Sequence, residues 1–499
     1  MQGIFPLFTA IPLAAAFFNL LITKVNRKVA DYLAFFTMTA LGTMAVLMLF
    51  EQPFVYKVGG WEAPWGILLV FDRLTAIMLL IINVIGWLAT VYSLKYMSTY
   101  TAKAKYYSLF LLMIGGMNGV VITGDMFNLF VFLEIASIAS YALVGFGCGK
   151  DELEASFKYL ILGGIASTGI LFGIAFLYSV TGTLNMPHMA RQLEAVGMNK
   201  AVLFAVALFI MGFGLKASSV PFHAWLPDAH PSAPAPISAM LSGVLIKALG
   251  VYTIIRIMFN VFGQNHLISS VIMFLGALSM VMAGLMAIGQ SDFKRMLAYS
   301  SISQIGYVML AVGLALNPSI PSKVAALAMF GALYHLVNHA VFKSLLFLDS
   351  GAVEYRTGTR DLNKLGGLIT RMPVTGATCS IGSLSIAGLP PFNGFWSKLV
   401  IVIALMQAHH IVYGGLAIFI SFITLVYFVK LQKNTVFGDL PDRLKAIKEA
   451  PFAMTFPLVI LAILCIALGV AYPFFQHQLV SAASTVLDKL TFMNLVVGG

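Results

Sequence analysis

Apolar runs of about 20 residues recur from one end of the chain to the other, and each is long enough to cross a hydrocarbon core of roughly 30 Å. Of the 499 residues, 60% are hydrophobic and only 10% are charged, whereas soluble globular domains carry about 25% charged residues. With a mean hydropathy of +0.93, the chain has too few polar side chains to cover a water-facing surface. The sequence therefore predicts an all-α protein that crosses a membrane many times.

The chain divides into fourteen candidate spans, which we expect to form one membrane domain over residues 1–499. The first run, from Phe5 to Ile22, follows no basic stretch and precedes no small-residue cleavage site. It is therefore expected to be a retained helix and not a removed signal. The spans are expected near residues 4–24, 30–50, 67–94, 105–122, 125–147, 153–181, 199–220, 233–259, 265–289, 296–315, 322–348, 375–404, 409–432 and 452–474.

Lysine and arginine are distributed unevenly between the loops. Loops after odd-numbered spans hold nineteen of these residues, from Lys24 to Lys448, whereas loops after even-numbered spans hold five. The five are Lys57, Arg191, Lys200, Arg256 and Lys323. Because basic loops remain in the cytoplasm, we expect a multi-pass protein of the cell (inner) membrane with both termini on the outer, periplasmic side.

The net charge of +11 follows from this loop bias, so we expect the lipid bilayer as a partner and no nucleic acid. The three cysteines, Cys148, Cys379 and Cys465, lie far apart and have no metal-ligand spacing. The sequence also lacks a haem motif, an iron–sulfur motif and a phosphate-binding glycine loop. We therefore expect no metal, no cofactor and no redox centre in this chain.

Two proline-containing segments interrupt the apolar pattern. They comprise residues 221–236, with Pro221, His223, Asp228 and His230, and residues 388–396, with Pro390 and Pro391. Non-helical backbone at membrane depth is tolerated only where it is buried in protein or lines a wet cavity. Paired interruptions also point to an inverted repeat and to the transport path. We expect inverted five-helix repeats over residues 105–259 and 265–432, with flanking helices in 1–94 and 452–499.

Several ionisable residues fall within the predicted spans, where a charge costs at least about 2.5–3.5 kcal/mol. These residues are Glu134, Lys216, Lys247, His335, His339, Lys343 and Lys398. His335, His339 and Lys343 are four residues apart and share one helix face. Such side chains are typical of proton relays. Burial disfavours the charged form of lysine, a nearby glutamate favours it, and histidine titrates near neutral pH.

A structural interpretation stays open for these side chains. A buried glutamate or histidine often serves only as a hydrogen-bonding group. A lysine near a helix end, such as Lys158 or Lys430, often extends to the membrane interface. His223, Asp228 and His230 could simply cap the ends of the interrupted helix.

The sequence around these residues resembles a known family. The matching segments are Gly214 to Lys216, Pro221-Phe222-His223-Ala224-Trp225-Leu226-Pro227-Asp228-Ala229-His230, Ser238 to Lys247, Asn128 to Glu134, Asp292 to Gln304, His339 to Lys343 and Pro390 to Lys398. The chain is similar, over about residues 65 to 430, to the antiporter-like subunits shared by Mrp sodium/proton antiporters, energy-converting hydrogenases and respiratory complex I. The loop over residues 59–66 looks most like the D subunit of Mrp antiporters and the hydrogenase branch.

The resemblance implies fourteen helices with discontinuous seventh and twelfth helices, and a proton path across the middle of the membrane. It assigns Glu134 and Lys216 to the glutamate and lysine of the fifth and seventh helices, and Lys247 to the connecting lysine. Lys343 takes the place of the eleventh-helix lysine, and Lys398 that of the exit-side group of the twelfth helix. A lysine at this last position differs from the complex I branch that carries a glutamate.

Three functions compete on the sequence alone. The first is a proton-translocating antiporter-like subunit that moves H+, with or without Na+, beside other membrane subunits. The second is a quinone-binding or metal-binding subunit of a redox enzyme, and the third is a structural scaffold for a membrane complex. We favour the first, because several charges within spans are costly to keep without a use. The host, whether an Mrp antiporter, a hydrogenase or a complex I-type NADH/quinone oxidoreductase, is not encoded in this chain.

Overall fold

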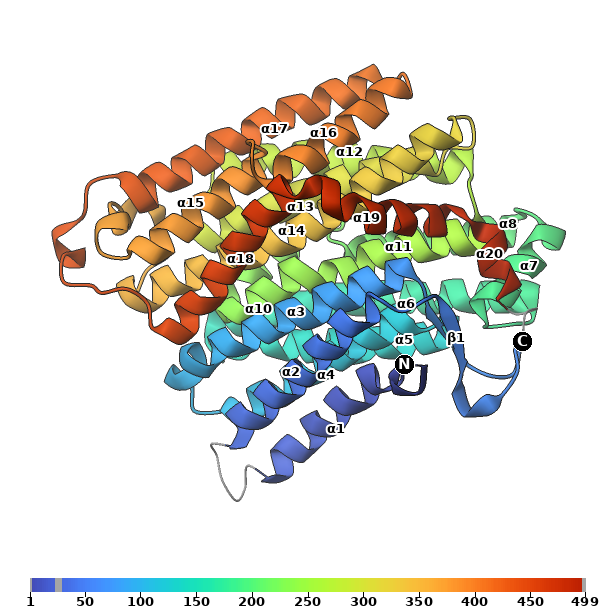
Figure 1. Ribbon diagram of the computed structural model, residues 1–499, viewed down its shortest axis with the longest axis horizontal. Helices are drawn as coiled ribbons and strands as arrows, with labels where there is room; N and C mark the ends of the chain where they lie inside the picture. The colour runs from blue at the N-terminus through green and yellow to red at the C-terminus, as the bar shows by residue number, and fades with distance from the viewer. Residues whose placement is uncertain (1, 23–28, 496–499) are drawn as a thin grey trace.

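The structure, a computed structural model (Figure 1), describes residues 2–22 and 29–495 as a bundle of mostly long helices. Within these residues, twelve helical segments are long and apolar enough to cross a membrane. They contain α1 (Leu7–Ile22), α2 (Val29–Met48), α3 (Arg73–Tyr96), α4 (Lys103–Ile122), α5 (Met126–Val144), α6 (Lys150–Thr181), α10 (Ala235–Met240) with α11 (Tyr252–Ile255), α12 (His266–Ile288), α13 (Phe293–Ala315), α14 (Ser322–Thr357), α17 (Ile411–Gln432) and α18 (Phe452–Val470).

The two remaining predicted spans correspond to pairs of shorter helices, and the second helix of the first pair begins beyond the expected end of its span at residue 220. The first pair is α8 (Lys200–Lys216) and α9 (Leu226–Ser232), and the second is α15 (Pro373–Ala387) and α16 (Asn393–Gln407). The breaks lie at the two proline-containing segments, because proline offers no backbone N–H to continue a helix. The twelve continuous segments and the two broken pairs together occupy the fourteen predicted positions.

The helical segment over residues 235–262 forms the centre of the bundle. Its most apolar stretch is entirely buried. Figure 1 shows α10 and α11 between the N-terminal helices α2 to α4 and the later helices α14 to α17. Most of it has π-helical hydrogen bonding, in η4 (Leu241–Leu245), η5 (Lys247–Val251) and η6 (Arg256–Phe262). Gly250 permits this close packing, since a Cβ there would lie 2.4 Å from the backbone nitrogen of Ala217.

Two strands and three further helices gather at one end of the bundle. Strands β1 (Phe54–Lys57) and β2 (Leu68–Phe71) form an antiparallel hairpin. Near it lie the amphipathic helix α7 (Met186–Val196) and the C-terminal helices α19 (Tyr472–Leu487) and α20 (Lys489–Asn494) (Figure 1). Strand β2 lies at the start of the span expected over residues 67–94, and the helix there begins only at Arg73. Helices α19 and α20 lie in the expected flanking region 452–499, whereas the short helix α7 has no counterpart among the expected spans.

The C-terminal helices hold earlier elements together at this end of the bundle. Lys489 lies 3.5 Å from the carboxylate of Glu194 on α7. Asn260 of η6 donates a hydrogen bond of 3.2 Å to the carbonyl oxygen of Val486. The ring of Phe492 lies 5.5 Å from the guanidinium group of Arg256. Helix α20 therefore packs over a segment that lies far away in the sequence.

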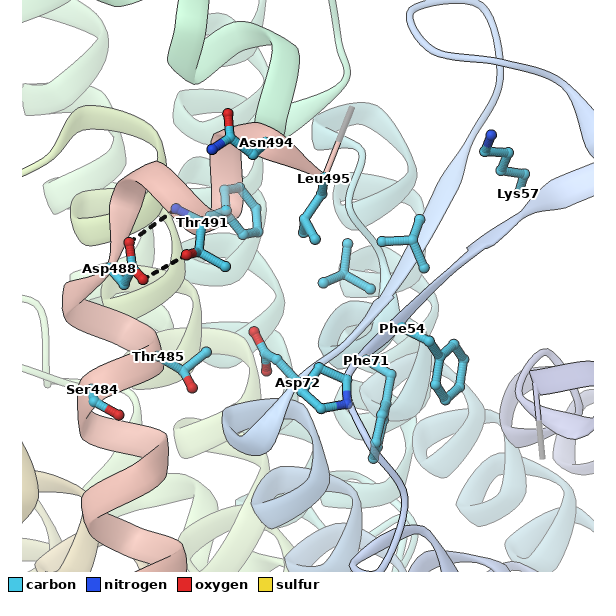
Figure 2. A pocket seen from close by; sticks show the side chains of 14 residues that line it. Phe54, Lys57, Phe71, Asp72, Ser484, Thr485, Asp488, Thr491, Asn494 and Leu495 are labelled. Atoms are coloured by element: carbon cyan, nitrogen blue, oxygen red, sulfur yellow. Dashed lines mark hydrogen bonds between the residues drawn. The ribbon is translucent and has the colours of Figure 1, made fainter. Parts of the chain in front are cut away.

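A cavity of about 590 Å³ separates α19 and α20 from the hairpin. Figure 2 shows Phe54 and Phe71 on the hairpin side, with Asp488 and Thr491 on the other. The Asp488 carboxylate accepts hydrogen bonds from the backbone and side chain of Thr491, and these bonds hold the pKa of Asp488 below its ordinary value. None of the ionisable residues singled out by the sequence lines this cavity.

Candidate functional site

The first half of the bundle holds an ion pair between two helices. Glu134 lies in α5 and Lys216 is the last residue of α8. The lysine Nζ lies 3.9 Å from Oε1 of Glu134, and the two side chains are 2% and 27% exposed, respectively. Both charges lose water on burial, and an opposite charge is the partner that best offsets this cost. The contact expected from the two charges is therefore present.

Three hydroxyl groups complete the surroundings of the pair. Lys216 donates hydrogen bonds to Ser137 Oγ at 2.8 Å and to Tyr141 Oη at 3.1 Å. Ser167 of α6 donates a hydrogen bond to Oε1 of Glu134. Hydroxyl groups both donate and accept hydrogen bonds, so they can support either charge state of the lysine and the glutamate.

The break after α8 places the Lys216 amine at a helix end. Ser218 adopts a left-handed conformation with φ of 58°, and the chain resumes helical structure only at Leu226. The indole N–H of Trp225 donates a hydrogen bond of 3.0 Å to the carbonyl oxygen of Leu215, which also accepts one of 3.0 Å from the backbone N–H of Ser218. The C-terminal end of a helix favours a cation, so the break also contributes to keeping a charge here.

Lys247 occupies the π-helical centre of the bundle. Its side chain is fully buried, and its Nζ donates a hydrogen bond of 2.6 Å to the carbonyl oxygen of Ser242. No carboxylate within residues 2–22 and 29–495 forms an ion pair with it. Lys247 thus differs from Lys216 in having a backbone dipole in place of a counter-charge.

Helix α14 presents His335, His339 and Lys343 on one buried face. The two imidazole rings are 6.4 Å apart between centroids. His335 Nδ1 lies 2.9 Å from Ser397 Oγ of α16, whereas neither ring nitrogen of His339 has a hydrogen-bond partner among the described residues. Lys343 donates hydrogen bonds to Ser300 Oγ at 2.6 Å and to a backbone carbonyl of α13 at 2.8 Å.

The amine of Lys398, on α16, lies at the C-terminal end of α15. Nζ donates a hydrogen bond of 2.8 Å to the carbonyl oxygen of Ile386 and lies 5.3 Å from the centroid of the Tyr307 ring. Helix α15 ends at the left-handed Gly388, with φ of 83°. Its last carbonyl groups are free to accept from the lysine because they have no helical partners.

The segment after the first break contains His223, Asp228 and His230, and none of them caps α9. The N-cap and C-cap positions are Trp225 and Ala233, without a side-chain cap. Asp228 instead forms ion pairs of 3.0 Å with Lys158 and of 3.0 Å with Arg295. Its role as a simple cap is therefore not supported by the geometry.

The two histidines of this segment are less well partnered. His230 is fully buried, and its ring stacks on Phe347 with centroids 4.4 Å apart. Neither of its ring nitrogens has a hydrogen-bond partner in the described part of the chain. His223 is half-buried and its Nδ1 is also without a partner there. Such buried nitrogens are usually satisfied by water.

The predicted residues thus form separate clusters. Glu134 and Lys216 touch, and His335, His339 and Lys343 stack along α14. Between residues 29 and 495, no direct hydrogen bond links Lys216 with Lys247, or Lys247 with the histidines. Water would have to bridge these gaps for a proton to pass.

Comparison with known proteins identifies the family. The model for "NADH:quinone oxidoreductase/Mrp antiporter, TM" matches residues 123–424, and a model for the N-terminus of chain 5 of NADH-ubiquinone oxidoreductase (complex I) matches residues 56–107. The first match covers more than half of the chain. The chain belongs to this antiporter-like family. It is therefore a multi-pass membrane protein of the type found as subunits of larger membrane complexes.

Individual members of the antiporter-like family come from different complexes. The N subunit of NADH-quinone oxidoreductase from Desulforudis audaxviator is 36% identical over 449 residues, which is 86% of each chain. The D subunit of the Na(+)/H(+) antiporter from Alkalihalophilus pseudofirmus is 32% identical over 445 residues, covering 89% of this chain and 88% of the relative. A chain in the structure of an archaeal membrane-bound sulfane sulfur reductase superposes with a TM-score of 0.89 and 32% identity, covering 99% of this chain and 100% of that chain.

The structure also reveals a buried ion pair that the sequence analysis missed. Arg256 was counted as a loop residue, but it lies within the central helical segment with 2% of its side chain exposed. Its guanidinium group contacts both carboxylate oxygens of Asp72, at 2.6 and 3.0 Å. The two residues are 184 positions apart. The apolar residues that continue to Phe262 were the signal that Arg256 remains inside the helix.

Two further buried charges of the antiporter-like chain were misplaced in the same way. Lys294, counted as a loop residue, is 1% exposed, and it donates a hydrogen bond of 2.9 Å to the carbonyl oxygen of Ala233 at the end of α9. Asp349 lies beyond the predicted end of its span at residue 348, but α14 continues to Thr357 and the side chain is fully buried. The apolar residues on both sides of Asp349 indicated its burial, whereas Lys294 stands next to Arg295 and close to Asp292 and has no such signal.

Proposed function

We propose that this chain is the proton-translocating subunit of a multisubunit membrane complex, corresponding to the D subunit of an Mrp-type cation/proton antiporter. The observation that carries the proposal is the Glu134–Lys216 contact next to the broken helix. A lysine that is 2% exposed, with one carboxylate at 3.9 Å, holds its proton while the contact lasts and is destabilised as a cation when the contact opens. The pair therefore forms a switch, and Lys247, His335, His339, Lys343 and Lys398 extend it across the bundle.

The direction of the chain in the membrane is part of the proposal. The bias of lysine and arginine toward odd-numbered loops places those loops in the cytoplasm. The hairpin, α7 and α20 then lie on the outer, periplasmic side together with both termini, in the cell (inner) membrane. The proposed transported species is H+, with or without Na+, and other membrane subunits and the lipid bilayer surround the chain.

Matching local structures support the proposed inverted repeats, 105–259 and 265–432. Helices α5 and α13 are each N-capped by an aspartate, Asp125 and Asp292, respectively. The backbone N–H of the first residue of α5 donates a hydrogen bond to Leu184 O just after α6, and that of the first residue of α13 donates one to Arg360 O just after α14. Both contacts follow a Thr-Gly-Thr sequence whose glycine is left-handed, at residues 182 and 358. The positions correspond to spans 5 and 6 in one repeat and to spans 10 and 11 in the other.

A second candidate function places the same subunit in a redox-driven complex. It is favoured by the 36% identity to the N subunit of NADH-quinone oxidoreductase and the 32% identity to a chain of the sulfane sulfur reductase. In that host, electron transfer in partner subunits would drive the proton movement, as in energy-converting hydrogenases or complex I. The two hosts are separated by testing whether a sodium gradient or an electron donor starts proton movement in vesicles that contain the complex.

The proposal is tested by neutralising the central pair. The complex with Glu134→Gln and Lys216→Met is purified by a tag on this chain, its subunits are identified, and it is reconstituted into vesicles with a pH-sensitive dye. We expect the complex to assemble and proton movement to be lost. Wild-type proton movement by the doubly neutralised complex would exclude the switch and favour a structural scaffold.

A further inference from the structure

A second buried carboxyl group lies far from the pair of Glu134 and Lys216. Asp349 is fully buried on α14, two turns before the helix ends at Thr357. Its Oδ1 accepts a hydrogen bond of 2.7 Å from Thr378 Oγ1 of α15. Its Oδ2 has no hydrogen-bond partner among the described residues. The function proposed above makes no use of this residue.

The surroundings of Asp349 contain no cation among the residues that the structure describes. The titratable side chains around it are Tyr92 of α3, Cys379 of α15 and Cys465 of α18, with Glu449 nearer the surface. Lys343 precedes Asp349 on α14, but its amine is bound to α13 through Ser300. A buried carboxylate without a cation is very costly, so such a group keeps its proton. A carboxyl group that holds a proton inside a bundle can also pass it on.

The Asp349 carboxyl group lies close to the lysine-rich and arginine-rich end of the bundle. Glu449, in the loop before α18, accepts hydrogen bonds from the backbone N–H groups of Val374 and Thr375 at the start of α15. Its carboxylate is partly exposed. Asp349 lies eight residues from the end of α14, a rise of about 12 Å. Thr375 donates a hydrogen bond of 2.7 Å to the Glu449 carboxylate, and Thr378, which donates to Asp349, follows one turn later on α15.

Polar side chains continue from Asp349 along α15 toward the second break. After Thr378 come Ser383, whose buried Oγ has no partner among the described residues, and Ser385, which donates a hydrogen bond to the side chain of Asn393. Asn393 is the first residue of α16 and also donates to Asn338 Oδ1 at 3.0 Å. In a chain with 60% hydrophobic residues, such a polar line between packed helices is costly unless it is hydrated or used.

The polar line ends at residues already placed in the proton path. Ser397, one turn after Asn393, lies 2.9 Å from Nδ1 of His335. His335 Nε2 has no hydrogen-bond partner among the described residues. Lys398 follows directly in the sequence. Asp349 Oδ2, Ser383 Oγ and His335 Nε2 are therefore three unpartnered buried atoms on one route, and each can hydrogen-bond to a bridging water.

We propose that Asp349 carries protons between the lysine-rich and arginine-rich end of the bundle, at Glu449, and the second broken helix, at His335 and Lys398. The inference rests on the proposed function. In the step, the O–H bond at Oδ2 of Asp349 breaks, and the proton passes by bridging water and the hydroxyl groups of Ser383 and Ser385 to the imidazole of His335. Thr378 donates to Oδ1 and is not part of this route. The carboxylate regains a proton from the side of Glu449. The second half of the bundle thereby has its own connection to that face.

The test compares two substitutions that separate a proton carrier from a purely structural hydrogen bond. Asp349→Asn has nearly the same volume and still offers Oδ1 to Thr378, but it cannot carry a proton. Thr378→Val removes the hydrogen bond and keeps the carboxyl group. In vesicles holding the complete complex, we expect Asp349→Asn to assemble and lose most proton movement, and Thr378→Val to keep most of it. Asp349→Glu, which restores a carboxyl group, should recover part of the activity.

An infrared measurement gives a readout that packing alone does not affect. The wild-type complex should show the C=O stretch of a protonated, buried carboxyl group, which shifts in D2O and is absent from the Asp349→Asn complex. Normal pumping by Asp349→Asn, with loss of pumping in Thr378→Val, would overturn the inference and make Asp349 a structural residue. If Asp349→Asn does not assemble, Thr378→Val decides: an assembled complex that does not pump overturns the inference, and normal pumping supports it.

Lys216→Ala, measured in parallel, separates the two proposals. If Lys216→Ala abolishes proton movement while Asp349→Asn pumps normally, only the role of Asp349 fails. If Lys216→Ala also pumps normally, the proposed function itself fails.

Discussion

Replacing Lys216 tests the switch most directly. At 3.9 Å from Glu134, two unit charges attract each other by about 4 kcal/mol at an effective dielectric constant of about 20. Partial exposure of Glu134 reduces this value through screening. Breaking the contact withdraws most of this stabilisation from the lysine cation, and about 1.4 kcal/mol corresponds to a factor of ten in an equilibrium constant. Opening and closing the pair is thus sufficient to release and reload a proton.

Lys216→Ala should therefore insert and assemble but fail to move protons. Alanine is less costly than lysine in a membrane helix, so the amount of assembled complex should not fall. A positioned proton-transfer group contributes roughly 100-fold to 10,000-fold, and we expect a loss of proton movement on that order. Lys200→Ala is the matched control, because Lys200 is an exposed lysine at the opposite end of the same helix. It should pump like the wild type.

Lys216→Arg distinguishes a proton carrier from a fixed charge. Arginine keeps the positive charge beside Glu134, but guanidinium does not release its proton in proteins. The assay is formation of a pH gradient in vesicles that hold the complete complex, with subunit content measured on the same sample. We expect Lys216→Arg to assemble and to be as inactive as Lys216→Ala. Normal pumping by the arginine variant would refute lysine as a carrier, since a fixed charge would then be sufficient.

Other contacts and the orientation are open to equally direct tests. Asp72→Asn leaves Arg256 buried without its carboxylate, so the unfolding temperature of the purified complex should fall as expected for a loss of about 3–5 kcal/mol. Glu62→Gln, in an exposed ion pair, is the control, and an equal effect of both substitutions would contradict the reasoning. Lys445→Cys, in a Cys148→Ser background that removes the exposed native thiol, should react with a membrane-impermeant thiol reagent only from the cytoplasmic side, and labelling only from outside would overturn the orientation. Ser137→Ala removes one of the hydroxyl groups bound to Lys216, so proton movement should slow but not stop, and complete loss would make the hydroxyl an essential relay group.

The burial of a charged residue could be predicted from the sequence where the residue interrupts an apolar run. Lys216 and Lys247 stand between apolar neighbours within their spans. A charge in such a run is costly when it faces lipid, so it faces the bundle interior. The two breaks were located for a similar reason, because proline has the same effect on every helix. The family motifs contain the same lysines and prolines, so the resemblance and the charge pattern point to the same residues.

Charges near helix ends carry a weaker signal in the sequence. Lys294 and Arg256 were counted with the loops because hydropathy measures how apolar a segment is and not whether its end is covered by other helices. The burial of Asp349 was not predicted, because α14 extends to Thr357, beyond the length that a bilayer requires. The pairing of Arg256 with Asp72 joins residues 184 positions apart, and no local pattern encodes such a contact.

The position of α20 has a consequence for biogenesis. Phe492 packs on Arg256, and Lys489 contacts Glu194 on α7, so α20 completes contacts with residues that are translated much earlier. A nascent chain released from the ribosome before α20 is made would leave the buried pair of Arg256 and Asp72 uncovered at this end of the bundle. Helix α20 thus covers this end of the bundle last, and a chain truncated before α20 would expose the Arg256–Asp72 pair to membrane quality control.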